Sequence, residues 1–331
     1  MMTAPPEAGA AGRQVGESLV LAGVEPGQLA HRRLAPGSVV VRSRYRADLP
    51  GNVVYREGED YRVDYATGQV RRVEGSRIPD YRRNSLFGQK DFDHTKFPGF
   101  GNYRDFVYVD YGYLDPFRWP VQARQTALLG RTQARLKQGE AVTVVAFGDS
   151  ITAGGDASAP ELIYWQRWLA ALRERYPQAK ITGVNGATGG DTTVQGLARL
   201  PEKVLARKPD LVLVAFGMND QNVGGVPLAR FEANLGELVD RIRKETPAEI
   251  VLLSSCLPNP NWHYTSSRMP EYGRVTEKVA AAKGCAFADV LANWKAIVDR
   301  KKPEDLLANN VNHPNDFGHW IYFQVLERLG L

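Results

Sequence analysis

From Ala141 onwards, short apolar runs alternate with amphipathic stretches, and this alternation limits the possible folds more than any other feature. The apolar runs are Val142–Phe147, Ile181–Val184, Leu211–Phe216, Ile250–Ser255 and Cys285–Val290. The amphipathic stretches are Glu161–Tyr176, Thr192–Lys208, Leu228–Glu245, Glu271–Lys283 and Phe317–Leu329. Strands that are apolar on both faces and alternate with helices indicate a parallel sheet covered on both sides. Right-handed crossovers then predict a three-layer α/β/α sandwich with five parallel strands.

The first part of the chain follows a different pattern. Tyr61–Tyr65 and Gln69–Val73 alternate between apolar and polar residues on either side of the turn Ala66–Gly68, which predicts a β-hairpin. The predicted organisation is a loosely packed arm at 1–34, a β-rich module at 35–118, a connecting helix at 119–137 and an α/β domain at 138–331. Residues 86–118 form no regular element in this interpretation. Their many rings either pack across a joint or form a wall of a substrate cleft, since flat aromatic faces suit sugars.

Length and charge agree with this division. A chain of 331 residues fits about two domains. The net charge of +5 lies entirely in residues 1–140, which carry 21 Lys and Arg against 16 Asp and Glu, whereas the rest is balanced. Basic pairs such as Arg71-Arg72 lie among acidic residues and indicate a solvated surface rather than a nucleic-acid site. A nucleic-acid partner is therefore not expected, and nothing indicates an oligomeric state.

Other functional classes lack their signatures. No stretch reaches the roughly 18 apolar residues of a membrane span. The start of the sequence as given does not resemble a signal peptide, so the compartment is undetermined, and is secreted or periplasmic if a leader was removed. Cys256 and Cys285 are too few for a disulfide framework and are expected to be buried thiols. The five histidines lack the spacing of metal ligands and no phosphate-binding loop is present, so neither a metal nor a cofactor is expected.

Polar segments follow the predicted strands. They are Gly148–Thr152, Asn185–Thr192 and Gly217–Asp220, with a fourth segment, Asn312–His319, near the end of the chain. In a parallel sheet the carboxyl ends of the strands share one edge, where ligands bind. A hydroxyl, a Gly-rich turn, an amide and a histidine would meet there. These are the groups of an acyl-transfer site: a nucleophile, oxyanion donors and a general base.

These four segments, in this order, resemble the SGNH hydrolases, also called the GDSL esterase/lipase family, over about residues 141–331. The resemblance implies a flavodoxin-like fold and serine esterase activity. It implies that Ser150 is the nucleophile and that its own N–H, the N–H of Gly190 and the side-chain amide of Asn219 bind the oxyanion. Asp149, Asn185 and Asp220 are then expected to hold the loops in place as structural acceptors.

The last segment departs from the family pattern of Asp-x-x-His followed by Pro. His313 precedes Pro314, but the residue three places upstream is Asn310 instead of Asp. In the first interpretation His313 is the base, oriented by Asn310, a backbone carbonyl or another carboxylate. In the second, Asp316 and His319 form the Asp-x-x-His pair, although Asn315 or Asp316 resembles a helix N-cap. In the third, the site binds a ligand without turning it over.

The loop after the fourth apolar run indicates the class of substrate. Trp262, His263 and Tyr264 are polar and aromatic, and they border the Ser150 cleft if the loop folds over the strand ends. This favours a carbohydrate O-acetyl esterase over an enzyme with an apolar acyl groove, so the expected partner is a small-molecule or carbohydrate ester. The alternatives are a lipase, thioesterase or acyltransferase on the same scaffold, and a non-catalytic glycan-binding protein.

Overall fold

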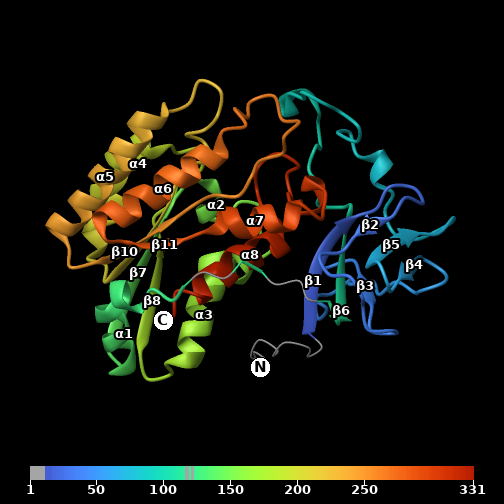
Figure 1. The fold of residues 1–331 in the computed structure, drawn as a ribbon, viewed down its shortest axis with the longest axis horizontal. Helices are drawn as coiled ribbons and strands as arrows, with labels where there is room; N and C mark the ends of the chain where they lie inside the picture. The colour runs from blue at the N-terminus through green and yellow to red at the C-terminus, as the bar shows by residue number, and fades with distance from the viewer. Residues whose placement is uncertain (1–11, 116–118, 121–122) are drawn as a thin grey trace. The chain divides into compact units, whose positions relative to one another are not determined.

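The computed structural model describes residues 12–115, 119–120 and 123–331 (Figure 1). Contacts divide the chain into two compact units. The β unit comprises the described residues up to Trp119 together with Ala296–Val311. The α/β unit comprises the described residues of Pro120–Lys295 and Asn312–Leu331.

One five-stranded sheet forms the centre of the α/β unit. Its strands are β7 (Ala141–Gly148), β8 (Lys180–Asn185), β9 (Leu211–Ala215), β10 (Glu249–Leu253) and β11 (Ala286–Ala288). They lie in the order β11-β10-β9-β7-β8, and all neighbours are parallel. This is the flavodoxin-like order, in which ligands bind beyond the carboxyl ends at the switch point between β7 and β9. The predicted five-stranded parallel sandwich is confirmed.

Helices cover the sheet. They are α1 (Gly130–Lys137), α2 (Ser150–Ala153), α3 (Tyr164–Arg175), α4 (Thr193–Lys203), α5 (Leu228–Glu245), α6 (Met269–Lys283), α7 (Val290–Val298) and α8 (Asp316–Glu327). The connection from β7 leads to β8 at one edge of the sheet, whereas the later connections lead towards the opposite edge. Right-handed crossovers therefore place α3 on one face and α4, α5 and α6 on the other. In agreement, α3 packs on α8, and α5 packs between α4 and α6 (Figure 1).

The spacing of apolar residues explains which helix faces are buried. In α5, Phe231, Leu235, Leu238 and Ile242 recur every three to four residues and are all buried. Each such side chain contributes about 2 kcal/mol by leaving water. The start of α4 has a capping box, in which the Thr192 side chain accepts from the Val194 N–H and Gln195 bonds back to the Thr192 N–H.

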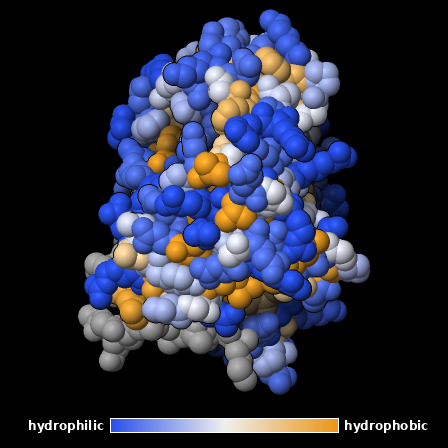
Figure 2. Space-filling model, turned by 90° about the vertical axis from the view of Figure 1, so that its right-hand side faces the viewer, coloured by the Kyte–Doolittle hydropathy of each residue, from blue (hydrophilic) through white to orange (hydrophobic). Residues whose placement is uncertain are grey.

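The β unit contains two three-stranded antiparallel sheets. One has the order β1-β6-β3, formed by β1 (Gly12–Val20), β6 (Phe106–Tyr113) and β3 (Val40–Arg42). The other has the order β2-β5-β4, formed by β2 (Gly27–Gln28), β5 (Gln69–Arg72) and β4 (Tyr61–Asp64). β4 and β5 confirm the predicted hairpin. Residues of both sheets share one apolar core, and Figure 2, which looks onto this unit from the side of β4 and β5, shows a mostly hydrophilic face.

Short 3₁₀ helices connect these elements. They cover Tyr81–Arg83, His94–Lys96, Thr126–Leu129, Pro160–Leu162, Leu205–Arg207 and Pro303–Asp305.

The predicted arm at 1–34 and the predicted loop at 86–118 are both wrong within the described residues. β1 pairs along β6 from Gly12 opposite Tyr113 to Val20 opposite Phe106. The polar side chain of Glu17 made β1 look exposed, yet Glu17 is fully buried because Lys301, Tyr111 and the Ala30 N–H bind its carboxylate. Residues 1–11 and 116–118 of these two segments lie outside the description.

The predicted domain boundary near residue 138 also differs from the structure. The division lies between Trp119 and Pro120, and Ala296–Val311 returns to the β unit. The predicted connecting helix is confined to α1 and the 3₁₀ turn before it, with residues 121–122 outside the description. Lys301 explains why Ala296–Val311 belongs to the β unit, since its ammonium lies 2.8 Å from Glu17 and both side chains are fully buried. A buried ion pair of this kind costs several kcal/mol when one partner is removed.

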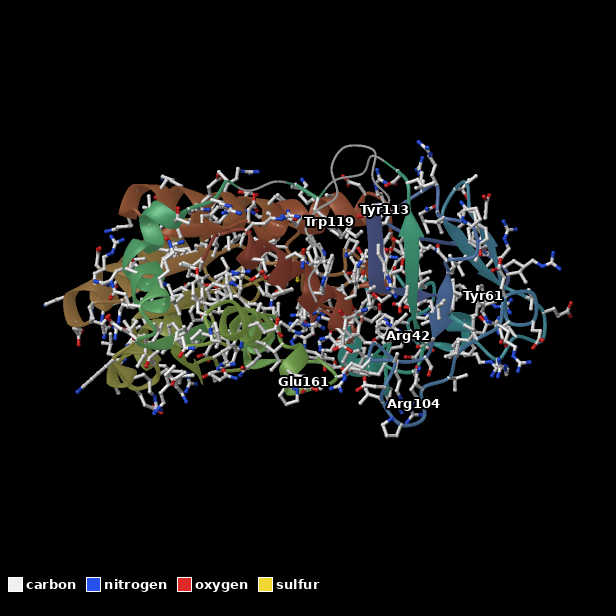
Figure 3. The ribbon with its side chains drawn as sticks, turned by 90° about the horizontal axis from the view of Figure 1, so that it is seen from below. Arg42, Tyr61, Arg104, Tyr113, Trp119 and Glu161 are labelled. Atoms are coloured by element: carbon white, nitrogen blue, oxygen red, sulfur yellow. The ribbon has the colours of Figure 1, made fainter. Side chains whose placement is uncertain are left out.

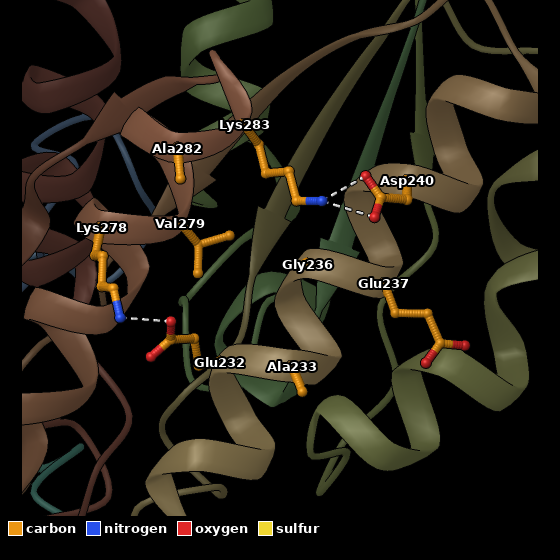
Figure 4. A pocket seen from close by; sticks show the side chains of 9 residues that line it. All are labelled: Glu232, Ala233, Gly236, Glu237, Asp240, Lys278, Val279, Ala282 and Lys283. Carbon is orange, nitrogen blue, oxygen red and sulfur yellow. Dashed lines mark hydrogen bonds and ion pairs between the residues drawn. The ribbon is translucent and has the colours of Figure 1, made fainter.

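Two other groups of charges are structural. Arg42, labelled in Figure 3, is buried in the β unit with its guanidinium 2.7 Å from Asp110. An open groove lies between α5 and α6, where Lys278 pairs with Glu232 and Lys283 pairs with Asp240 (Figure 4). Exposed pairs of this type contribute about 0–1 kcal/mol each. None of the site residues predicted from the sequence lines this groove.

Two further expectations concern cysteines and membrane spans. Cys256 and Cys285 are free and buried, as predicted, and burial raises the pKa of the Cys256 thiol to about 12. No helix among the described residues combines the length and apolarity needed to cross a bilayer.

Candidate active site

Ser150 lies at the switch point of the sheet, directly beyond the carboxyl end of β7. Asp149 caps the short helix α2, because its carboxylate accepts the Ile151 N–H at 3.0 Å. The glycine at 148 is required by space, since a Cβ there would lie 2.3 Å from the Ala215 carbonyl oxygen. The strand, glycine and cap thus present a half-buried Ser150 side chain at the edge of the sheet.

His313 reaches Ser150 from the segment that precedes α8. The Ser150 Oγ lies 2.7 Å from His313 Nε2, so the hydroxyl can donate to the imidazole. Asn315 caps α8 by accepting the Gly318 N–H at 2.9 Å, and the helix begins at Asp316, three residues after His313. The structure therefore brings the predicted hydroxyl and base into direct contact.

Asp156 completes this hydrogen-bond chain, and the sequence interpretation did not name it. Its Oδ2 lies 2.6 Å from His313 Nδ1. Gly155 permits this approach, because a Cβ there would lie 2.9 Å from His313 Nδ1 and 2.8 Å from the Ser150 carbonyl oxygen. Asp156 itself has a positive φ of 65°, which is uncommon for a residue other than glycine. The available signal was the Gly154-Gly155-Asp156 turn just after the serine segment.

The proposed orienting role of Asn310 is a wrong prediction. The Asn310 amide donates to the Tyr81 hydroxyl at 3.0 Å, within the β unit, and its φ is +59°. The Nδ1 of His313 faces Asp156 instead. The first interpretation of the sequence also included another carboxylate as the group that orients His313, and Asp156 is such a carboxylate.

The alternative pair of Asp316 and His319 does not form the hydrogen-bond chain either. His319 lies one turn into α8, fully buried, with Nε2 3.4 Å from the Gly155 carbonyl oxygen. Asp316 accepts from the Ser158 N–H at 2.8 Å and from the Ser158 hydroxyl at 2.7 Å. Burial lowers the pKa of His319 to about 3, so this imidazole is neutral near neutral pH.

The buried neutral His319 predicts a loss of stability in acid. The unfolded chain binds a proton at an ordinary pKa near 6.5, whereas the folded chain does not until about 3. The free energy of unfolding therefore falls by about 1.4 kcal/mol per pH unit inside this window as pH decreases. Urea unfolding of the wild type should show a steeper loss between pH 6 and 4 than that of His319→Gln. Equal slopes would contradict a neutral buried imidazole.

Gly190 and Asn219, the predicted oxyanion donors, belong to loops that meet next to the Gly189–Asp191 segment. A Cβ on Gly189 would lie 3.9 Å from the Ser150 Cβ, and the adjoining Gly190 is exposed with a φ of +78°. The Asn219 amide donates to the Asp191 carbonyl at 2.9 Å, which ties it to the residue after Gly190. Since an amide carries two N–H groups, this bond leaves a second one for a ligand.

The three residues expected to be structural acceptors bind backbone groups. Asp220 accepts the Thr193 N–H at 2.9 Å and the Gly217 N–H at 3.1 Å, which joins the loop after β9 to the start of α4. Asn185 accepts the Ala187 N–H at 3.1 Å. Asp149 caps α2, and desolvation raises its pKa to about 7.

The loop predicted to bind substrate packs onto the loop that carries Asn219. The Val223 N–H donates to the Tyr264 carbonyl at 2.9 Å, and Thr265 donates to Gln221 at 3.2 Å. Trp262 is buried, so its ring supports the loop, whereas His263 and Tyr264 are exposed. His263 and Tyr264 are therefore exposed on a loop that is hydrogen-bonded to the loop that carries Asn219.

Comparisons with known proteins agree with this geometry. Residues 146–321 match the GDSL-like lipase/acylhydrolase family. Esterase TesA of Pseudomonas aeruginosa is 36% identical over 155 residues, which are 46% of this chain and 71% of that protein. An acetylxylan esterase of Geobacillus stearothermophilus is 28% identical over 210 residues, which cover 58% of this chain and 95% of that protein.

A solved structure shares the fold. Axe2, an acetylxylan esterase from Geobacillus stearothermophilus, superposes with a TM-score of 0.51 and 28% identity, covering 59% of this chain and 97% of that one. The family match spans the segments that hold Ser150, Asn219 and His313. The chain therefore belongs to the GDSL-like lipase/acylhydrolase family and is a serine ester hydrolase.

Proposed function

We propose that this protein is a carbohydrate O-acetyl esterase in which Ser150 is the nucleophile, His313 the general base and Asp156 the group that orients His313. The observation that carries the assignment is the hydrogen-bond chain from Ser150 Oγ through both imidazole nitrogens to Asp156, with distances of 2.7 and 2.6 Å. A nucleophile within reach of a base, which is oriented by a third group, is the arrangement that activates a hydroxyl.

The reaction follows from these contacts. His313 Nε2 takes the proton of Ser150 as Oγ forms a bond to the ester carbonyl carbon. The resulting imidazolium is stabilised by the Asp156 carboxylate at Nδ1. His313 then protonates the leaving alcohol and the C–O bond breaks, which leaves an acyl-Ser150. Water, deprotonated by His313, attacks this ester, and Ser150 is released with its proton and a free carboxylic acid.

The negative charge on the carbonyl oxygen is assigned to three donors. They are the N–H of Ser150, the N–H of Gly190 and the second amide N–H of Asn219. Asp220 and Asp191 support this arrangement, because they hold the loops of Gly190 and Asn219 together through the Thr193 N–H and the Asn219 amide. A preorganised donor of this kind contributes about 3 kcal/mol to transition-state stabilisation.

Three observations support an acetylated sugar as the substrate. The His313 and Asp156 side chains keep 21% and 23% of their surface exposed, so the site is open to a bulky polar alcohol. His263 and Tyr264 are exposed beside the Asn219 loop. One relative, which this chain covers over 95% of its length, is named an acetylxylan esterase.

A substrate panel tests this proposal. We expect kcat/KM to be highest for p-nitrophenyl acetate within a series of acyl lengths, and higher still for acetylated xylo-oligosaccharides, because the open site offers contacts to sugars. The release of acetate is measured for each substrate, with Ser150→Ala as the blank. A preference for octanoyl esters or thioesters would refute the sugar assignment in favour of a lipase or thioesterase.

A further inference from the structure

The segment Gly154–Ser158 carries Asp156, and α2 alone does not hold it. It leaves α2 through Gly154, which has a φ of 104°, and the Gly155 N–H donates to the Ser150 carbonyl at 2.7 Å. Asp156 then takes the left-handed conformation and stays partly exposed. Such a conformation is unfavourable for a residue with a side chain and persists where its surroundings enforce it. The contacts at the far end of the segment therefore matter.

Asp316, the first residue of α8, binds that far end. Its two carboxylate oxygens accept the N–H and the hydroxyl of Ser158, at 2.8 and 2.7 Å. The carboxylate is buried, and the Arg167 guanidinium donates to the Asp316 carbonyl at 3.1 Å. A second contact comes from the next turn of α8, where His319 Nε2 faces the Gly155 carbonyl oxygen.

Capping of α8 does not account for a buried carboxylate at this position. Asn315 already serves as the N-cap, by accepting the Gly318 N–H at 2.9 Å. Burial raises the pKa of Asp316, so holding the ionised side chain inside the protein is costly. The hydrogen bonds to Ser158, followed by the positive charge of Arg167, offset this cost. The start of α8 thus joins the Asp156 segment to the segment that carries His313.

We propose that Asp316 and Ser158 are positioning residues that hold Asp156 against Nδ1 of His313. This inference rests on the proposed role of Asp156. His313 lies three residues before Asp316 on the same segment. The bonds from Asp316 to Ser158 therefore hold the segment of Asp156 at a fixed distance from the segment of His313. A shift of about 1 Å at such a contact is enough to lower the rate about a hundredfold.

A double-mutant cycle tests the proposal on the full chain. We expect Asp316→Ala to lower kcat for p-nitrophenyl acetate by about 10–100-fold with little change in KM. In Asp156→Ala the same second substitution should lower kcat no further, because the carboxylate that it positions is gone. Asp316→Asn, which keeps an acceptor for the Ser158 N–H, should recover part of the loss. Ser158→Ala provides the same measurement if Asp316→Ala does not fold.

Asp210→Ala is the matched control. Asp210 also accepts a backbone N–H, that of Thr143 at 2.8 Å, but at the amino end of the sheet. It should lower Tm and leave kcat unchanged below the transition. Normal kcat in Asp156→Ala would overturn the proposed triad. If Asp156→Ala shows a large loss, two results would overturn the positioning role alone. One is a normal kcat in Asp316→Ala, and the other is a double variant whose loss is the product of the two single losses.

Discussion

Substituting His313 with alanine is expected to lower kcat for acetyl esters about 10⁵- to 10⁶-fold, the same loss as in Ser150→Ala. Ser150 and His313 share one proton across the 2.7 Å contact. Without His313 the Ser150 hydroxyl is not activated, and without Ser150 the imidazole has no nucleophile to activate. In a comparable triad, removal of the serine or the histidine alone costs nearly as much as removal of all three members. The double variant should therefore be no slower than either single variant.

His319 provides the internal comparison for this experiment. It is the only other histidine in the last segment, and its buried imidazole faces the Gly155 carbonyl instead of Ser150. His319→Gln should retain far more activity than His313→Ala, although it loses one contact to the Asp156 segment. The measurement is single-turnover acylation together with labelling of Ser150 by a serine-directed phosphonate. An inactive His319→Gln alongside an active His313→Ala would reverse the assignment of the base.

The parts of the site that follow strands were accessible from the sequence. Ser150, Gly190 and Asn219 each come shortly after an apolar run, and the geometry of a parallel sheet requires such residues to meet at one edge. In the structure, Gly189 lies beside Ser150, and Asn219 is hydrogen-bonded to Asp191. The periodicity and the sheet topology thus predict the edge at which these segments meet, and the family resemblance supplied the roles of the individual residues.

Asp156 was missed because a tertiary turn, and not a strand end, brings it to His313. The family spacing pointed to position 310, where this chain has an asparagine bonded to Tyr81. Nothing in the periodicity marks a residue held at a φ of 65° by contacts from a helix about 160 residues away. A Gly-Gly pair followed by an acid, just after the nucleophile, was the remaining local sign.

The β unit was predicted less well for a similar reason. β1 contains Gln14, Glu17 and Ser18, all buried, and its polar composition resembles a solvated arm. Their partners are distant in sequence: Glu17 binds Lys301, and Ser18 donates to the Asp305 carbonyl at 2.6 Å. Polar residues that are buried through long-range pairs cannot be distinguished from exposed ones by pattern alone. The same contacts explain why Ala296–Val311 leaves the α/β unit.

Replacing Asp156 with alanine is the second decisive change, and kcat is expected to fall about 10⁴-fold. Without the carboxylate 2.6 Å from Nδ1, the imidazole loses the group that sets its tautomer and stabilises its protonated form. Losses of this size accompany removal of the acid in other serine triads. KM should change little, because Asp156 faces His313 and not the ester.

Asn310 is the control for this substitution, since the family pattern would have assigned it the same role. Asn310→Gly suits the φ of +59° and removes the bond to Tyr81, so it should lower Tm but reduce kcat far less than Asp156→Ala. Asn310→Asp introduced into Asp156→Ala should not restore activity, because the side chain at 310 is directed to Tyr81 Oη. Recovery of activity in that double variant would show that position 310 reaches His313, and the role of Asp156 as the orienting group would have to be abandoned.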